Sequence, residues 1–176
     1  MTTRSKVRPL IYTDVETTGL DSAEDQLVEV SYAVEDGPIK TLYFGVMEVP
    51  DSTIDELIKF SARGIAGISS TDAEIDEFLA ISNGATMVSA NPPFDMAFLQ
   101  ANDLYRFHYR CLDIESFAMA TLELPFVPGM SEINLIINEK FGEDLPMGDH
   151  TSAGDVHALR EAHRWLCARN HALNGG

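Results

Sequence analysis

The chain has 176 residues, of which 45% are hydrophobic, and this length supports a single domain whose core needs no disulfide or metal to hold it. Its 12 Lys and Arg residues against 28 Asp and Glu residues give a formal net charge of −16, which argues against passive binding of long nucleic acid. The absence of an apolar signal segment, and of any run of about 18 apolar residues, predicts a cytoplasmic protein without a membrane span.

The first predicted strand carries two acids near its end. A short apolar run beginning at Leu10 leads to Asp14 and Glu16, and the segment then meets Gly19. Because side chains alternate along a strand with period two, both carboxylates point to the same side, where they repel each other. A divalent cation would relieve that repulsion. Taken alone, however, an Asp-x-Glu pair is more often a solvated strand end.

The next segments predict an antiparallel start to the sheet. Two apolar, β-branched runs at 26–35 and 39–47 flank Asp36 and Gly37, and Asp-Gly between such runs is a strong hairpin signal. The pattern then becomes helical from residue 51 to residue 83, where Gly64 and Gly67 are expected to separate two helices. Thr71 and Glu74 have the spacing of a capping box at the start of the second helix.

The second half of the chain alternates between strands and helices. A short strand at 85–90 is followed by Asn91 and two prolines, which open a helix that holds Asp95 and Phe98. The remaining predicted elements are a strand at 111–114 and helices at 116–122, 131–140 and 152–170. Three antiparallel strands followed by this alternation predict an α/β domain with a mixed five-stranded sheet flanked by helices. We expect one domain over residues 1–176, with a flexible N-terminus at 1–8.

The acids of these elements are expected to meet. Asp14 and Glu16 end the first strand, Asp95 lies in the first turn of the helix after the fourth strand, and Asp155 opens the last helix. Strand ends and helix starts gather at one rim of an α/β sheet, where sites form. His150 can face the same site only from the loop before the last helix.

Three motifs now resemble the DnaQ-like 3′–5′ exonucleases of the DEDDh group, in the RNase H-like superfamily. Asp14-Val-Glu16-Thr-Thr-Gly-Leu resembles their first motif, Asn91-Pro-Pro-Phe-Asp95 their second, and His150-x4-Asp155 their third. The order and the separation of the motifs match as well. One departure is Ser89-Ala90 in place of the Gly-His that many relatives carry before the Asn.

The branch within the superfamily is left open by the sequence. The stretch from Phe107 to Asp113 is similar to a segment of oligoribonucleases and to one in DnaQ-like enzymes encoded by phages. Its residues His108 and Arg110 would either contact a phosphate or pack a subunit interface.

The resemblance implies an RNase H-like fold and metal-dependent hydrolysis of 3′-terminal phosphodiester bonds in single-stranded nucleic acid, with DNA favoured, to give nucleoside 5′-monophosphates. Two Mg²⁺ or Mn²⁺ ions would be held by the carboxylates of Asp14, Glu16, Asp95 and Asp155. His150 would be the general base, since its unperturbed pKa lies near neutral.

The resemblance also implies substrate contacts and partners. The terminal nucleotide would be held by five residues: Thr17, Thr18, Leu20, Asn91 and Phe98. Single-stranded 3′ ends of DNA or RNA are the expected partners, with a polymerase or another replication protein as a candidate, whereas the oligomeric state is left open. Two alternatives stand beside this reading: an oligoribonuclease-like enzyme acting on short RNA, and an inactive acidic binding or polymerase-docking module.

Overall fold

The computed structural model describes residues 7–45, 63–65 and 67–174. In chain order the elements are β1 (Leu10–Thr17), β2 (Leu27–Val34), β3 (Ile39–Tyr43), α2 (Asp72–Ser82), β4 (Thr86–Ser89), α3 (Pro92–Ala101), β5 (Leu112–Asp113), α4 (Ile114–Thr121), α5 (Met130–Phe141) and α6 (Ser152–Asn174). None of these helices is long and apolar enough to cross a membrane.

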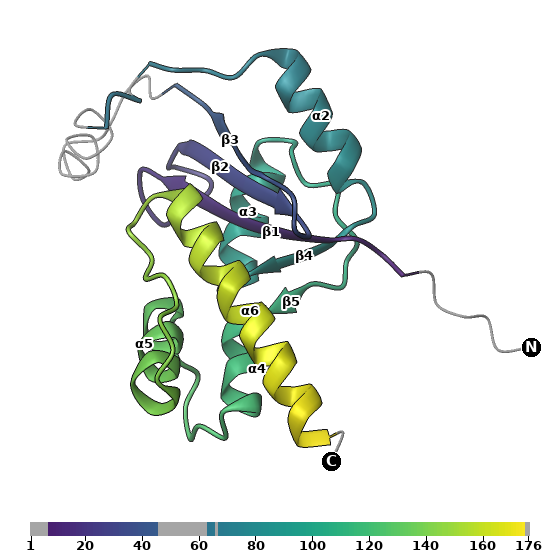
Figure 1. Ribbon diagram of the computed structural model, residues 1–176. Coiled ribbons are helices and arrows are strands. Elements are labelled where there is room, and N and C mark those ends of the chain that lie inside the picture. Colours follow the sequence, from purple (N-terminus) through teal and green to yellow (C-terminus); the bar gives the residue numbers. More distant parts are fainter. Residues whose placement is uncertain (1–6, 46–62, 66, 175–176) are drawn as a thin grey trace, which may run out of the picture.

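The strands form one mixed sheet in the order β3-β2-β1-β4-β5, with β1 at its centre (Figure 1). β1 pairs antiparallel with β2, and β2 antiparallel with β3, whereas β4 is parallel to both β1 and β5. The predicted α/β fold with a mixed five-stranded sheet is therefore confirmed. At the hairpin between β2 and β3, Glu35 adopts a φ of 48° and the Gly37 amide donates to the Val34 carbonyl at 2.8 Å.

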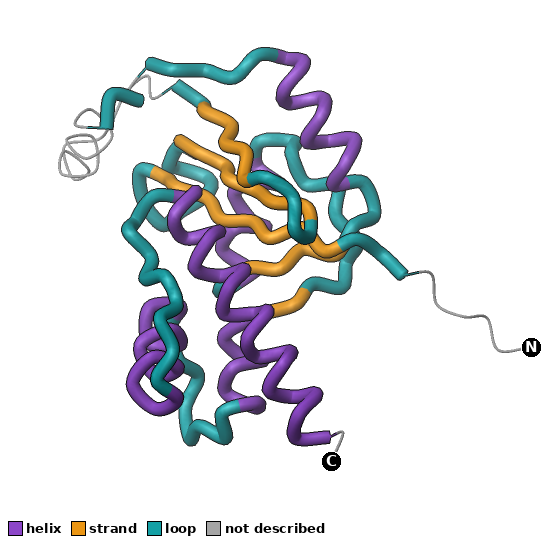
Figure 2. The backbone as a smooth tube through the Cα atoms, in the orientation of Figure 1, coloured by secondary structure: helices purple, strands orange, loops and turns teal. Residues whose placement is uncertain are grey.

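Helices cover the two faces of the sheet, as the backbone trace shows (Figure 2). On one face, Ile11 and Val15 of β1 pack in a buried cluster with Phe78 of α2 and Phe98 of α3. On the other face, Tyr12 packs in a second cluster with residues from α4, α5 and α6. Adjacent residues of β1 thus enter different clusters, because side chains alternate across a strand. This alternation places Asp14 and Glu16 on the face of Tyr12 and α6.

Local signals explain several element boundaries. Thr71 and Glu74 form the predicted capping box at the start of α2. Within the helical region predicted over 51–83, the described residues 63–65 and 67–71 are not helical, in agreement with the break expected at Gly64 and Gly67, whereas residues 51–62 lie outside the described part. The side chain of Asp113 accepts bonds from the amides of Glu115 and Ser116, so α4 begins at Ile114, earlier than expected. The predicted flexible N-terminus at 1–8 lies mostly outside the described residues.

Candidate metal and active site

The candidate site begins with the two acids of β1. In the antiparallel pairing, Asp14 is the partner of Ser31 and Glu16 the partner of Glu29. The register between β1 and β2 shifts after Glu16, at Thr17, where the strand ends. Both acids therefore lie on the α6 face, at the end of β1 from which the chain turns away.

The first turn of α6 brings a third acid to the pair. The Asp155 amide donates to the Thr151 carbonyl at 2.9 Å, which fixes this residue in the opening turn. Asp14, Glu16 and Asp155 each offer one carboxylate oxygen, and these atoms lie within 4.8 Å of one another. The strand end and the helix start thus meet as the sequence predicted, although they are about 140 residues apart in the chain.

Asp95 enters from the other side of the sheet. It lies in the first turn of α3, whose start at Pro92 and Pro93 follows Asn91 in the left-handed conformation. Its carboxylate is almost fully buried, with 2% of the residue exposed. Burial raises the pKa of Asp95 to about 8, although interactions with backbone groups of Asp95 and Val15 lower it.

The charges of these acids affect one another. Burial raises the pKa of Asp14 well above its usual range, and the next largest contributions are the charges of Asp95 and Asp155. Burial also raises the pKa of Asp155, which the charge of His150 partly offsets. The charges of Asp95, Asp155 and Glu16 all raise the pKa of Asp14, so the four predicted acids are close enough to act on one another.

The donor set suits a hard divalent cation. Mg²⁺ and Mn²⁺ prefer carboxylate oxygens, and the three gathered acids offer only such atoms. A bound cation would also relieve the repulsion that raises the pKa of Asp14. Asp14, Glu16 and Asp155 could hold one ion directly, and Asp95 could hold a second through its proximity to Asp14.

His150 lies in the loop before α6, with an exposed side chain and a φ of 59°. It lines a small pocket of about 70 Å³ together with Asp14 and Asp155. The loop is shaped by Asp149, whose carboxylate accepts bonds from the amide and the hydroxyl of Thr151 at 3.0 and 2.7 Å. The histidine can therefore exchange protons with solvent while facing the acids.

Gly148 packs tightly against one of the acids. A Cβ atom added at this position would lie 2.3 Å from Oδ1 of Asp155, closer than real Cβ contacts. Glycine is thus required here because a side chain would displace the Asp155 carboxylate.

The predicted substrate contacts divide into two groups. Leu20 is 86% exposed, Asn91 is exposed, and Thr17 is partly accessible. Thr18 is instead buried, and its hydroxyl accepts a bond from the Gln26 amide at 2.9 Å. Phe98 is also buried, in the core beside α2. In this conformation the side chains of Thr18 and Phe98 offer no surface to a nucleotide, which corrects the expectation for these two residues.

Two other residues of the sequence analysis lie away from the acids. The His108 ring is stacked on Tyr109 with 4.2 Å between ring centroids, and its Nδ1 accepts a bond from the Arg110 amide at 3.1 Å. The guanidinium carbon of Arg110 lies over the Tyr109 ring, 5.4 Å from its centroid. The His108 amide donates to the Ala85 carbonyl before the start of β4, whereas Asp95 follows the other end of that strand.

A fourth acid on the α6 face was not predicted from the sequence. Glu29 of β2 is 1% exposed and forms an ion pair with Arg63 at 2.6 Å. Its other oxygen accepts a bond from the Ser152 hydroxyl at 2.8 Å. The signal that could have found Glu29 is an acid in the middle of an otherwise apolar strand, at the position opposite Glu16.

The fold of this chain is similar to the folds of several solved nuclease structures. No family model and no curated protein matches the sequence. A solved structure described as the apo form of a nuclease is 17% identical, with a TM-score of 0.58 and coverage of 94% of this chain and 74% of that one. Brucella melitensis NrnC with bound Mg²⁺ is 18% identical, with a TM-score of 0.51 and coverage of 94% and 75%.

A product-bound exonuclease I is 13% identical to this chain, with a TM-score of 0.62. The match covers 96% of this chain and 45% of the exonuclease. The nuclease resemblance found in the sequence and the structural comparison agree, and the chain shares the α/β fold of these nucleases.

Proposed function

We propose that this protein is a metal-dependent 3′–5′ exonuclease that removes nucleoside 5′-monophosphates from single-stranded nucleic acid, with DNA favoured. One observation carries the proposal: ligand oxygens of Asp14, Glu16 and Asp155 lie within 4.8 Å of one another, and His150 shares a pocket with two of these acids. The fold shared with nucleases supports it. The Mg²⁺ in the NrnC structure supports a divalent cation.

In this proposal, four carboxylates bind the metal ions and one histidine accepts a proton. Asp14, Glu16, Asp95 and Asp155 would hold two Mg²⁺ or Mn²⁺ ions, which when bound supply Lewis-acid polarisation of the phosphate and neutralise charge on the leaving oxygen. A ring nitrogen of His150 would accept the proton of the attacking water, a role that suits an exposed imidazole beside acids. The proton would then pass from the ring to solvent.

The terminal nucleotide would be held by residues around the end of β1 and the start of α3. Leu20 presents 86% of its surface to solvent, and an exposed apolar side chain beside a polar rim can pack on a base. Asn91 offers an amide that makes no cap bond to α3. The partly accessible hydroxyl of Thr17 donates to the Gly19 carbonyl at 2.6 Å and so orders the turn that carries Leu20.

The second candidate function is oligoribonuclease-like clearance of short RNA. The net charge of −16 favours it, because an acidic surface repels the body of a long strand more than a short one. DNA and RNA of equal length, compared in one assay, separate the two candidates.

The proposal is tested by incubating the protein with 5′-labelled single strands in the presence of Mn²⁺ and measuring the length of the labelled products. Stepwise shortening of the labelled strand with release of mononucleotides is expected, and a strand with a 3′ phosphate should resist cleavage. Equal cleavage of a circular strand would identify an endonuclease. If no strand is cleaved while Mn²⁺ still binds, the chain is instead a binding or docking module.

A further inference from the structure

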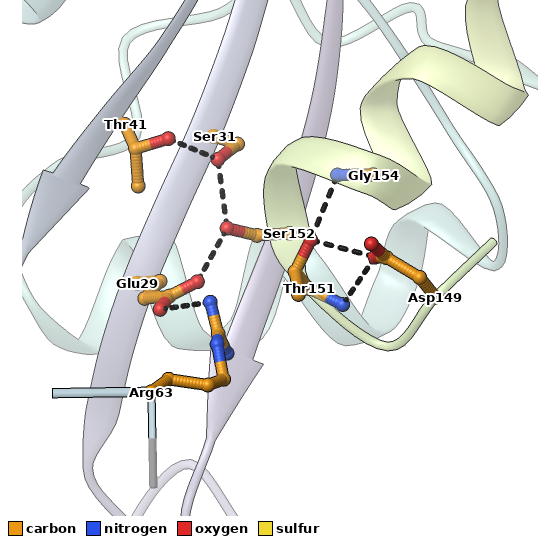
Figure 3. A network of polar contacts seen from close by, with 8 residues as sticks. All are labelled: Glu29, Ser31, Thr41, Arg63, Asp149, Thr151, Ser152 and Gly154. Atoms are coloured by element: carbon orange, nitrogen blue, oxygen red, sulfur yellow. Dashed lines mark hydrogen bonds and ion pairs between the residues drawn. The ribbon is translucent and has the colours of Figure 1, made fainter. Parts of the chain in front are cut away.

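Glu29 is a buried carboxylate beside the candidate metal site. It lies opposite Glu16 in the pairing of β1 with β2, on the same face of the sheet. Only 1% of Glu29 is exposed, and both of its oxygens have partners, Arg63 on Oε1 and Ser152 on Oε2. Figure 3 shows this network from close by. A buried carboxylate is costly unless it is paired and hydrogen-bonded, and Glu29 meets both conditions here.

A chain of hydroxyl groups ends on this carboxylate. Thr41 and Ser31 are 2.7 Å apart, Ser31 and Ser152 are 2.7 Å apart, and Ser152 donates to Glu29. Each hydroxyl has one proton. Because the Ser152 proton goes to the carboxylate, Ser31 must donate to Ser152, and Thr41 must then donate to Ser31. The charge of Glu29 thus gives every bond in the chain a single direction, from β3 through β2 to α6 (Figure 3).

The network holds the first turn of α6. Ser152 is the first residue of that helix, two residues after His150 and three before Asp155. It is fully buried, and its hydroxyl is hydrogen-bonded to both Ser31 and Glu29 of β2. The opening turn of α6 therefore takes its position relative to the acids of β1 from a hydroxyl held between Ser31 and Glu29.

Arg63 completes the network from the segment before α2. Its side chain is 27% exposed, and its guanidinium donates to Glu29 at 2.6 Å. The pKa of Asp149, next to His150, is lowered mainly by the hydrogen bond from Thr151 and in small part by the charge of Arg63. Arg63 therefore contacts Glu29 directly and is near enough to the loop of His150 for its charge to act on Asp149.

We propose that Glu29 and Ser152 are positioning residues that hold His150 and Asp155 against Asp14 and Glu16, so that the site is built before metal or substrate binds. This inference rests on the proposed function for its effect on turnover, but its effect on metal binding does not depend on it. Groups that orient metal ligands from outside the site change metal affinity or activity by about 10- to 100-fold when removed.

The test compares two variants that each remove one buried hydroxyl between the sheet and α6. Ser152→Ala removes the bond to Glu29. Tyr12→Phe is the matched control, because the Tyr12 hydroxyl lies 2.8 Å from Nδ1 of His163, in the middle of the same helix and away from the acids. Thermal unfolding of both variants measures the loss of stability that any buried hydrogen bond brings. Glu29→Gln, which keeps the shape of the side chain and loses the ion pair, provides a second test.

Three readouts are made on the full chain: Mn²⁺ affinity by calorimetry, amide exchange of Asp155 and Val156, and kcat separately from KM. Ser152→Ala should weaken Mn²⁺ binding by roughly 10- to 100-fold, speed exchange in the first turn of α6 and lower kcat with little change in KM. Glu29→Gln should act in the same direction. Tyr12→Phe should leave all three readouts near those of the parent protein.

Equal Mn²⁺ affinity and equal exchange in Ser152→Ala and Tyr12→Phe would overturn the positioning role and leave Ser152 an ordinary packing residue. If the parent protein binds Mn²⁺ but releases no mononucleotide, the proposed function fails, while affinity and exchange still decide the role of Glu29 and Ser152. If the parent protein binds no Mn²⁺, amide exchange decides it alone.

Discussion

Glu16 on β1 and Glu29 on β2 are directly opposite each other in the antiparallel pairing of the two strands. Like charges at such positions repel. The fold neutralises one of them internally, because Glu29 is buried against Arg63, and gathers the other with Asp14 and Asp155. Glu29, which is paired with Arg63, thus lies beside the cluster of Asp14, Glu16 and Asp155, whose charge a metal ion would neutralise.

The stability of the metal-free protein should depend on Asp95 in a defined direction. Burial raises its pKa to about 8 in the fold, above about 3.9 in an unfolded chain. The folded state therefore keeps this proton to higher pH than the unfolded state, so the contribution of Asp95 to stability is present below pH 4 and is lost as the pH rises towards 8. Asp95→Asn should gain stability relative to the parent protein over that range.

Urea unfolding in EDTA from pH 4.5 to 8.5 measures the difference between the two proteins. Glu77→Gln, which changes an exposed partner of Lys40, is the control and should show no such trend. A constant difference between Asp95→Asn and the parent protein at every pH would contradict the raised pKa.

Replacement of His150 should lower the rate of the chemical step without weakening metal binding. Asn is the better replacement than Ala, because it tolerates the φ of 59° at this position. His150→Asn should lower kcat by roughly 10²- to 10⁴-fold, the range for losing a general base. Mn²⁺ affinity, measured by calorimetry, should survive; its loss with residual turnover intact would make His150 a metal ligand.

A methyl group at Gly148 should move one metal ligand. The added Cβ would lie 2.3 Å from Oδ1 of Asp155, and rotation of that carboxylate away from the site relieves this clash at the lowest energetic cost. Gly148→Ala should therefore weaken Mn²⁺ binding by about tenfold or more, while the melting temperature changes little. In Gly129→Ala the nearest atom, on Glu132, is 3.8 Å away, so this control should bind Mn²⁺ normally. Normal affinity in Gly148→Ala would show that Asp155 is not held as described.

Substrate length should matter little. Beyond the acid cluster the net charge of −16 repels a long strand, so only the last nucleotides are gripped. If about two phosphates are contacted, log K should fall with log salt at a slope of roughly −1.4. Strands of five and thirty nucleotides should then have similar kcat/KM across a salt series at fixed free metal. A steep slope with strong preference for the long strand would reveal an extended binding track.

The sequence predicted the elements whose signals are local. The capping box of Thr71 and Glu74, the turn at Gly37 and the prolines before Asp95 all depend on neighbours a few residues away, and these features were found where expected. The antiparallel pairing of the first three strands followed from the same signals. The predicted acids also came together, since Asp14 and Asp155 lie at a strand end and a helix start.

Features that depend on contacts between distant segments were missed. Glu29 and Ser152 are 123 residues apart, and nothing local shows that the acid is buried. His163 gives no local signal of burial in the sequence either, yet it is 6% exposed, and the Tyr12 hydroxyl lies 2.8 Å from its Nδ1 across the interface between the sheet and α6. Phe98 is aromatic and could stack on a base, but its position on α3 makes its side chain point into the core.

The assignment of Asp14 to a metal site that turnover requires is tested most directly by measuring how binding and turnover depend together on Mn²⁺. Calorimetry and release of mononucleotides are measured over one Mn²⁺ series for the parent protein and for Asp14→Asn. At 100 times its Kd the ion should stabilise the parent fold by about 2.7 kcal/mol, or roughly 5–10 °C in melting temperature. Turnover should rise over the concentrations at which Mn²⁺ binds, and Asp14→Asn should lose the binding, the thermal shift and the turnover together. A variant that keeps the same thermal shift and the same rate as the parent protein would contradict the account.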